Sequence, residues 1–117
     1  MELDWNDGQL AQGLGHYRAR EYFEAHEAWE SVWLLASEPD KTFLQALIQI
    51  AAAFHHLQRD NVQGATSLLQ NARRRLENYP AHFASIDVAL LRSELCQGLT
   101  ALEDGAVSLT APKITPL

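Results

Sequence analysis

The chain has 117 residues, enough for one domain to bury an apolar core without disulfides or a structural metal. With 47% hydrophobic and 21% charged residues it has the composition of an ordinary globular protein, and no apolar run reaches the roughly 18 residues of a membrane span. The formal net charge of −6 argues against non-specific nucleic-acid binding, which needs clustered positive charge. We therefore expect one globular domain with neither a nucleic-acid nor a membrane partner.

Two features favour the cytoplasm. Residues 1–4 are acidic and lack the basic and apolar regions of a secretion signal. Cys96 is the single cysteine, so no internal disulfide can form, and its place on an apolar helical face predicts a buried, unreactive thiol. The one basic cluster, residues 73–75, is expected to be solvated because consecutive helical residues point about 100° apart.

Hydrophobic residues recur with the helical period and no segment alternates convincingly, so we predict an all-α fold, a single bundle of about five helices. Helices are predicted over residues 5–19, 21–36, 40–58, 61–77 and 85–103. Pro39 suits the start of the third helix and Asn61 can cap the fourth. Gly105 ends the fifth, which gives a helical domain over 1–105 and an extended, partly disordered tail over 106–117.

The third predicted helix carries no full charge from Thr42 to Gln58. Because a solvent-facing side would normally carry Lys or Glu, we expect this helix to be central and covered on both faces. Its polar stripe consists of Gln45, Gln49 and His56. These side chains must then find partners inside the protein.

A weak internal repeat is visible at an offset of 40 residues. The matching pairs are Leu14 with Phe54, Tyr22 with Val62, Ala25 with Ala65, and Trp29 with Leu69. Each half is a helix, a tight turn and a second helix, which resembles tetratricopeptide-type hairpins. With two degenerate copies, an ordinary bundle and a solenoid both stay open, and so does a protein or peptide partner.

Residues 22–33 concentrate the side chains that could perform chemistry. His26 and Glu30 are four apart on an otherwise apolar face, with Glu27 at its flank. The string His-Glu-x-x-Glu is similar to the His-Glu-x-x-His of zinc proteases, with Glu30 in place of the second histidine. This harder ligand set would suit manganese, iron or zinc. If the second and third helices are neighbours, His56 completes a tentative metal set of His26, Glu30 and His56.

Three interpretations of this group stay open. The polar side chains could satisfy one another in a buried network that only fixes helix register. They could instead bind a small ligand, a divalent metal or a partner. In the third interpretation, Glu27 or Glu30 is the base of a metal-dependent hydrolase that also uses His26. The candidate functional residues are His26, Glu27, Glu30, Gln45, Gln49 and His56.

The remaining aromatic and titratable residues receive simpler predictions. Tyr22 and Phe23 belong to the apolar face of the second helix, and Trp29 and Trp33 are predicted core residues. Glu24 is predicted to be solvated. The histidines for which the sequence identifies no partner are expected at surface or boundary positions: His16, His55 and His82. So short a bundle with apolar helix flanks also favours a homo-oligomer.

The chain resembles the bacterial and archaeal family called domain of unknown function 309 over residues 10–92. The residues that carry the resemblance are Tyr22-Phe23-Glu24-Ala25-His26-Glu27-x-x-Glu30-x-x-Trp33, Phe43-Leu44-Gln45-Ala46-Leu47-Ile48-Gln49, His56 and Asn61-x-x-Gly64-Ala65. The resemblance implies a small all-helical bundle and no particular activity. The positions that define the family hold His26, Glu27, Glu30, Trp33, Gln45, Gln49 and His56 here. Asp60 stands where the family usually has glycine, a change that turn geometry tolerates.

Overall fold

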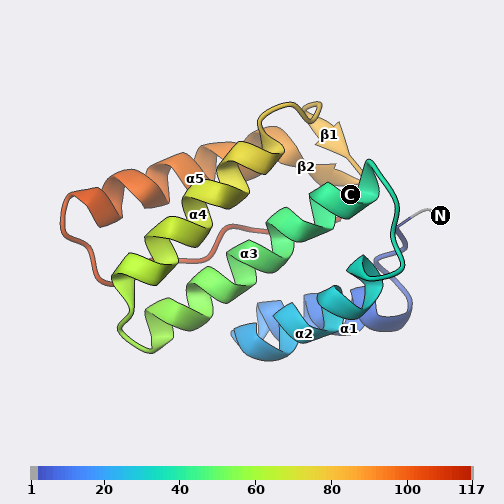
Figure 1. Ribbon diagram of the computed structural model, residues 1–117, viewed down its shortest axis with the longest axis horizontal. Coiled ribbons are helices and arrows are strands. Elements are labelled where there is room, and N and C mark those ends of the chain that lie inside the picture. The colour runs from blue at the N-terminus through green and yellow to red at the C-terminus, as the bar shows by residue number, and fades with distance from the viewer. Residues whose placement is uncertain (1–2, 117) are drawn as a thin grey trace.

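The computed structural model describes residues 3–116 and confirms an all-α fold (Figure 1). The elements are α1 (Gly8–Arg18), α2 (Tyr22–Trp33), α3 (Asp40–Gln58), α4 (Val62–Leu76), β1 (His82–Phe83), β2 (Ile86–Asp87) and α5 (Val88–Glu103). All five predicted helices are present among the described residues, and each begins and ends within three residues of the prediction. No helix in residues 3–116 is long and apolar enough to cross a membrane.

Successive helices pack beside one another, with α3 in the middle of the array (Figure 1). The hairpin α1–α2 covers one side of α3, and α4 with α5 lies on the other side. Ten of the 19 residues of α3 are buried, which explains why the helix carries no charged face. The prediction that this helix is central is therefore confirmed.

The offset of 40 residues holds for the backbone of the two hairpin turns. Arg20 and Asp60 occupy equivalent positions with left-handed φ angles of 65° and 60°. In each turn the next residue donates its N–H to the carbonyl of a histidine five residues earlier, at 2.8 Å: the pairs are Glu21 with His16 and Asn61 with His56. Aspartate adopts this conformation more readily than most residues, which is why Asp60 can occupy it without glycine. The hairpins are thus two copies of one motif.

A short antiparallel hairpin, β1–β2, precedes α5 and was not predicted. Its two turn residues, Ala84 and Ser85, have φ angles of 51° and 65°. Two-residue hairpin turns of this kind usually have the sequence Asn-Gly or Asp-Gly, and neither is present here. The start of α5 also lies later than predicted, because Asp87 caps the helix by accepting the N–H of Leu90 at 3.0 Å.

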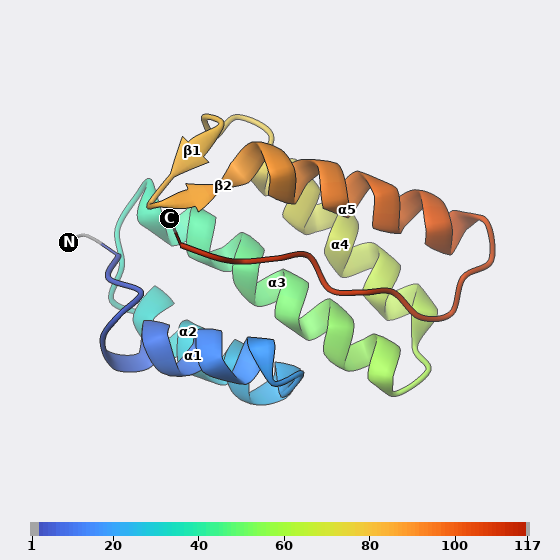
Figure 2. The same ribbon diagram turned by 180° about the vertical axis from the view of Figure 1, so that it is seen from behind.

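The described part of the tail, residues 106–116, is extended as predicted, and it packs against the rest of the protein. Figure 2 shows it crossing α3 between α5 and the α1–α2 hairpin. Ile114 is only 2% exposed and belongs to the apolar core. The hydroxyl of Tyr17 donates to the carbonyl of Pro112 at 2.7 Å. One buried apolar side chain and one hydrogen bond to the main chain therefore hold a segment that has no helical or strand period of its own.

Two burial predictions are wrong for a shared reason. Cys96 is exposed, although its neighbour Leu95 is 1% exposed and packs in the core. Phe23 is 45% exposed, although its neighbour Tyr22 is 6% exposed. In both helices the buried stripe is narrower than the run of apolar residues, so one apolar side chain at its edge faces outward. Trp29, in contrast, is fully buried as predicted.

Candidate functional site

A small cavity of about 190 Å³ lies between α2 and α3. Its lining residues are Phe23, His26, Ala52, His55 and His56. Two of the residues proposed from the sequence, His26 and His56, therefore meet at one place although 30 residues separate them. The reason is that α2 and α3 pack as neighbours, as the interpretation required.

Aromatic rings line this cavity in a continuous row. The centroid of the Phe23 ring lies 5.7 Å from that of His26 and 5.4 Å from that of His55. The ring of His56 follows at 6.2 Å from His55. These separations are typical of packed aromatic pairs. Phe23 therefore joins histidines from two helices, and the half of it that is exposed forms part of the cavity rim.

His55 was not among the predicted site residues, yet it is the histidine whose titration the site perturbs most clearly. Desolvation lowers the pKa of His55, and the positive charge of Arg59 lowers this pKa further, as does His56 when it is protonated. Its imidazole is therefore neutral at pH 7. Among the described residues, histidine side chains hydrogen-bond only at His16 and His56. One ring nitrogen of His55 is thus a free acceptor.

The protonated nitrogen of His56 can be assigned from its partner. The N–H of Gly64 donates to Oδ1 of Asn61 at 3.0 Å, which fixes the orientation of this amide. Its Nδ2 lies 3.0 Å from Nδ1 of His56 and must be the donor, so the neutral imidazole carries its proton on Nε2. His56 therefore offers a hydrogen-bond donor. It offers no free lone pair to a metal while this contact holds.

His26, which lines the cavity, pairs with Glu30 one turn further along α2. Their Nε2 and Oε2 atoms are 3.5 Å apart, and the side chains are 26% and 52% exposed. No polar or charged residue in residues 3–116 is buried, so the predicted buried network is wrong. The inward positions of α2 are taken by Ala25, Ala28 and Trp29, which places His26 and Glu30 at the margin of the helix interface.

The other predicted residues lie elsewhere. Gln49 accepts a hydrogen bond from Nε of Arg75 at 3.1 Å, and so faces α4. Glu27 lines a different hollow together with His16 and Gln9 of α1. Gln45 is partly buried on α3 and does not line the cavity.

The tentative metal set of His26, Glu30 and His56 is not assembled as a ligand group. Among the described residues, no three His, Cys, Asp or Glu side chains are placed to hold a metal ion. The geometry therefore gives a metal-dependent hydrolase built on His26, Glu27 and Glu30 no support. Glu27, one of the two proposed bases, lines a different hollow and does not line the cavity with His26 and His56.

Trp33 lies at the far end of α2 and is partly buried at the edge of the core. Nζ of Lys41 lies 4.2 Å from the centroid of its ring and donates to its main-chain carbonyl at 3.0 Å. The cation packs over the aromatic face, an arrangement that stabilises both groups. The indole N–H is buried and meets no acceptor among the described residues.

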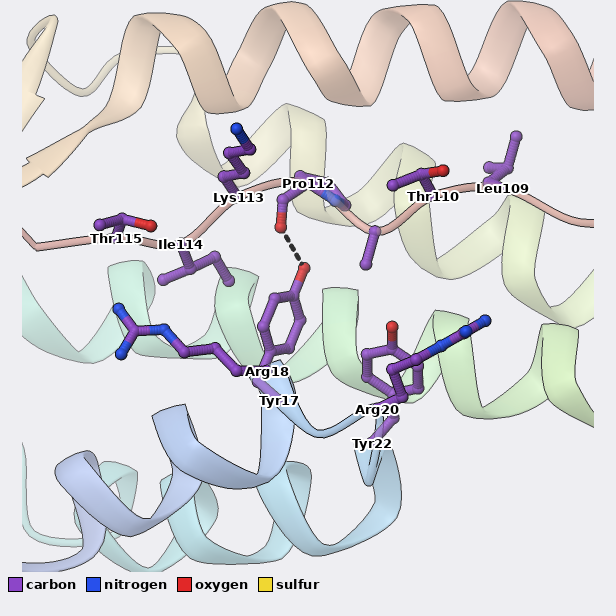
Figure 3. A pocket seen from close by; sticks show the side chains of 11 residues that line it. Tyr17, Arg18, Arg20, Tyr22, Leu109, Thr110, Pro112, Lys113, Ile114 and Thr115 are labelled. Atoms are coloured by element: carbon purple, nitrogen blue, oxygen red, sulfur yellow. Dashed lines mark hydrogen bonds between the residues drawn. The ribbon is translucent and has the colours of Figure 1, made fainter.

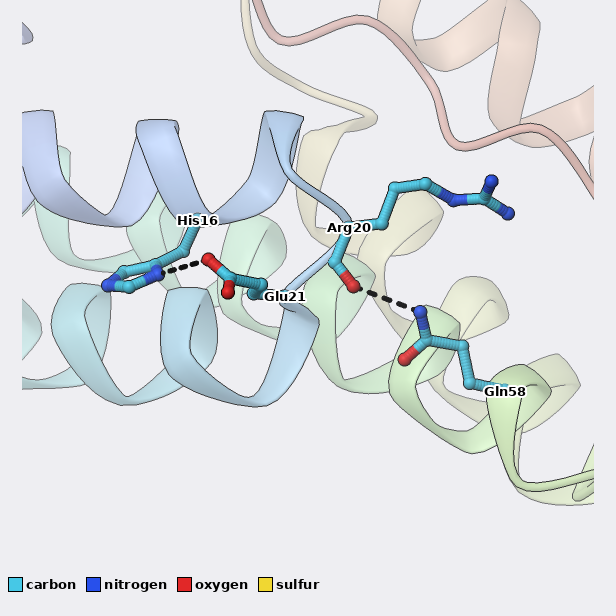
Figure 4. Close-up of polar contacts among 4 residues, drawn as sticks. All are labelled: His16, Arg20, Glu21 and Gln58. Carbon is cyan, nitrogen blue, oxygen red and sulfur yellow. Dashed lines mark hydrogen bonds and ion pairs between the residues drawn. The ribbon is translucent and has the colours of Figure 1, made fainter.

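Polar contacts lock the turn between α1 and α2, and the sequence did not reveal them. Nδ1 of His16 lies 2.9 Å from Oε1 of Glu21, and Nε2 of Gln58 donates to the carbonyl of Arg20 at 2.9 Å (Figure 4). His16 therefore has a partner, contrary to expectation. It is the counterpart of His56 at the offset of 40 residues, and each pairs with the residue five positions later. His82 is exposed and Glu24 is solvated, both as predicted.

The fold and the cavity define the class of protein as an array of helical hairpins with a histidine-rich hollow between its second and third helices. The family Domain of unknown function (DUF309) matches residues 10–68, and the chain belongs to this family. The matched segment runs from α1 into α4 and contains every residue of the cavity. α5 and the tail follow it in the chain.

Two relatives extend the comparison. The chain is 30% identical to an uncharacterized protein of Aquifex aeolicus (strain VF5) over 86 residues, which cover 73% of this chain and 26% of that protein. It is 30% identical over 100 residues to the uncharacterized protein YpuF of Bacillus subtilis (strain 168), covering 83% of this chain and 55% of that protein. The chain thus spans about a quarter of one relative and about half of the other.

Proposed function

We propose that this protein is a partner-binding helical module of the cytoplasm, and that a side chain of the partner enters the cavity between α2 and α3. The observation that carries the proposal is the combination of an exposed aromatic ring and three imidazoles around one small hollow. Exposed aromatic residues beside a pocket are the usual anchors of protein interfaces.

The size of the cavity supports a partner side chain over a free small molecule. Small-molecule sites usually enclose roughly 300–1,000 Å³. The cavity here measures about 190 Å³, enough for one side chain. The relatives give independent support, because the matched segment is only 26% of the Aquifex aeolicus protein and is therefore joined there to further chain.

The polar groups of the cavity define what the entering side chain carries. His56 presents an Nε2–H donor, and neutral His55 presents an acceptor. Phe23 supplies an apolar wall. An apolar side chain with a polar tip that both donates and accepts, such as tyrosine, satisfies all three groups.

Random-peptide display against the full chain, followed by fluorescence anisotropy with the selected peptides, tests this proposal. Phe23→Ala should weaken binding at least tenfold, which corresponds to about 1.4 kcal/mol. Leu90→Ala is the matched control, because Leu90 of α5 is 46% exposed and Phe23 is 45% exposed. Selected peptides that bind Phe23→Ala and the unaltered protein equally well would overturn the proposal.

A second copy of the chain is one partner to examine directly. Light scattering with size-exclusion chromatography gives the mass of the protein in solution. If the cavity mediates self-association, Phe23→Ala should reduce a dimer to the monomer and Leu90→Ala should not. A dimer that survives Phe23→Ala unchanged would assign self-association to another surface.

A further inference from the structure

A second and larger cavity lies on the other side of the α1–α2 turn, where the tail crosses the hairpin (Figure 3). Its volume is about 350 Å³, within the usual range of small-molecule sites. One wall consists of Tyr17, Arg18, Arg20 and Tyr22, and the opposite wall of residues 109–115 of the tail. It shares no lining residue with the histidine-rich cavity.

Three cationic residues line this cavity, and their charged ends point in different directions (Figure 3). Arg18, Arg20 and Lys113 line it, although the whole chain has only nine lysines and arginines and a net charge of −6. Among residues 3–116, the pairs of opposite charge within 4.0 Å are His16 with Glu21 and His26 with Glu30. No described carboxylate therefore forms an ion pair with these three cations, although the charge of Glu94 acts on Tyr17 at the cavity wall.

The hydroxyl groups of Tyr17 and Tyr22 differ in their hydrogen bonds. Tyr17 gives its hydroxyl proton to the carbonyl of Pro112, and this contact fixes the tail (Figure 3). Tyr22 is 6% exposed, and the hydrogen bonds of the described residues leave its hydroxyl proton unused. Burial raises the pKa of the Tyr22 hydroxyl and the adjacent Arg20 guanidinium lowers it, so the two groups lie close together. A phenol donor beside a guanidinium is a ready contact for an anion.

We infer that this cavity binds a small organic oxyanion, namely a phosphate or carboxylate group carried on an aromatic or apolar body. Arg20 and Tyr22 contact the oxyanion, since the planar fork of arginine matches phosphate and carboxylate oxygens. The ring of Tyr17 and the side chain of Ile114 face the apolar body. Arg18 extends beneath Ile114 and Arg20 extends past Tyr22 in the opposite direction, so a cation marks each end of the cavity (Figure 3).

The tail makes binding at this cavity measurable in a second way. A ligand that touches both walls binds only while residues 109–115 are docked on the hairpin. Binding must then stabilise the docked tail by mass action. We expect the ligand to slow cleavage of the segment 106–116 by a protease of broad specificity.

Isothermal titration of the full chain with phenyl phosphate, benzoate, inorganic phosphate and benzylamine tests the inference. At least one of the aromatic anions should bind saturably, more tightly than benzylamine and more tightly than inorganic phosphate. Phenyl phosphate as the tighter of the two aromatic anions assigns a phosphate ligand, and benzoate a carboxylate. Failure of both to bind below about 10 mM, or equal binding of benzylamine, overturns the inference.

Variants locate the site. Arg20→Gln and Tyr22→Phe should each weaken the aromatic anion at least tenfold and remove its protection of the tail. Arg73→Gln is the matched control, because Arg73 is an exposed arginine on α4 that does not line the cavity. An equal loss with Arg73→Gln, or no loss with Arg20→Gln while circular dichroism shows a folded protein, overturns the assignment.

Discussion

Gly13 allows α1 to pack directly against the largest buried side chain of the protein. A Cβ at this position would lie 2.3 Å from Nε1 and 2.5 Å from Cδ1 of Trp29, where about 3.5 Å is the normal contact. The indole has no room to withdraw, because it is fully buried and its ring lies 6.4 Å from that of Trp5 and 5.7 Å from that of Tyr17. Gly13→Ala must therefore strain the interface between α1 and α2.

The expected change in the free energy of unfolding combines two destabilising effects and one stabilising effect. Overpacking of a well-packed core costs about 1–3 kcal/mol. Displacement of the indole also breaks the hydrogen bond from its Nε1 to the carbonyl of Leu10, 3.3 Å long, at a further cost of about 1–3 kcal/mol. Alanine in place of glycine inside a helix stabilises the helix by about 1 kcal/mol, because its helix propensity is higher. We expect Gly13→Ala to lower the free energy of unfolding by about 1–5 kcal/mol.

Gly15→Ala provides the matched control. It lies in the same helix, and a Cβ there meets nothing within 4 Å. Helix propensity then acts alone, and the variant should be more stable by about 0.5–1 kcal/mol. Urea titration followed by circular dichroism measures both variants. If Gly13→Ala is as stable as Gly15→Ala, the packing of α1 on Trp29 described above is incorrect.

Three further predictions concern the tail, the histidine-rich cavity and the second turn. Tyr17→Phe removes the hydrogen bond to Pro112 and should cost about 0.5–1.5 kcal/mol while speeding proteolysis of the tail; an unchanged cleavage rate would show that this contact does not hold the tail. Since burial and nearby cations lower the folded pKa of His55 below its ordinary value of 6.5, the folded state binds fewer protons than the unfolded state. Stability from this residue should be complete above pH 6.5 and should be lost as the pH falls through the folded pKa, and an NMR titration that places the pKa at or above 6.5 would contradict the assignment. Asn61→Ala removes the cap of α4 and should cost about 1 kcal/mol in thermal unfolding, with an effect below about 0.3 kcal/mol counting against the cap.

Periodicity predicted the helices and their neighbours well because each helix has an apolar stripe that must be buried. The absence of charge in α3 correctly placed it at the centre, between α2 and α4. The offset of 40 residues correctly paired the two hairpin turns. Arg20 and Asp60, which have left-handed φ angles, are separated by this same offset. These features depend on local sequence and on the pattern of apolar residues, both of which are visible in the chain.

The features that were missed depend on contacts between distant segments. Ile114 is buried because residues from distant parts of the chain pack around it, and nothing in residues 106–116 alone indicates this packing. The hairpin β1–β2 has only two residues in each strand, too few for alternation to be recognised. Cys96 and Phe23 lie one position beyond the buried stripe, and helical periodicity does not resolve so small a rotation.

The candidate site shows the same division. The sequence placed His26 near His56 on the condition that α2 and α3 are neighbours; they are, and both histidines line one cavity. The part of the prediction that failed was burial, since the small side chains Ala25 and Ala28 occupy the interface and leave His26 at its margin. His55 was missed because it belongs to the site through its contact with Phe23, which only the packing of the two helices creates.

The proposed partner site is tested most directly by the carbon-attached proton signals of the histidine rings, recorded by NMR during titration with a selected peptide. Binding at the cavity between α2 and α3 predicts that the signals of His26, His55 and His56 shift together and saturably. The signals of His16 and His82, which do not line this cavity, should stay in place. Saturable binding that shifts His16 or His82 and leaves the three cavity histidines unchanged would contradict the account.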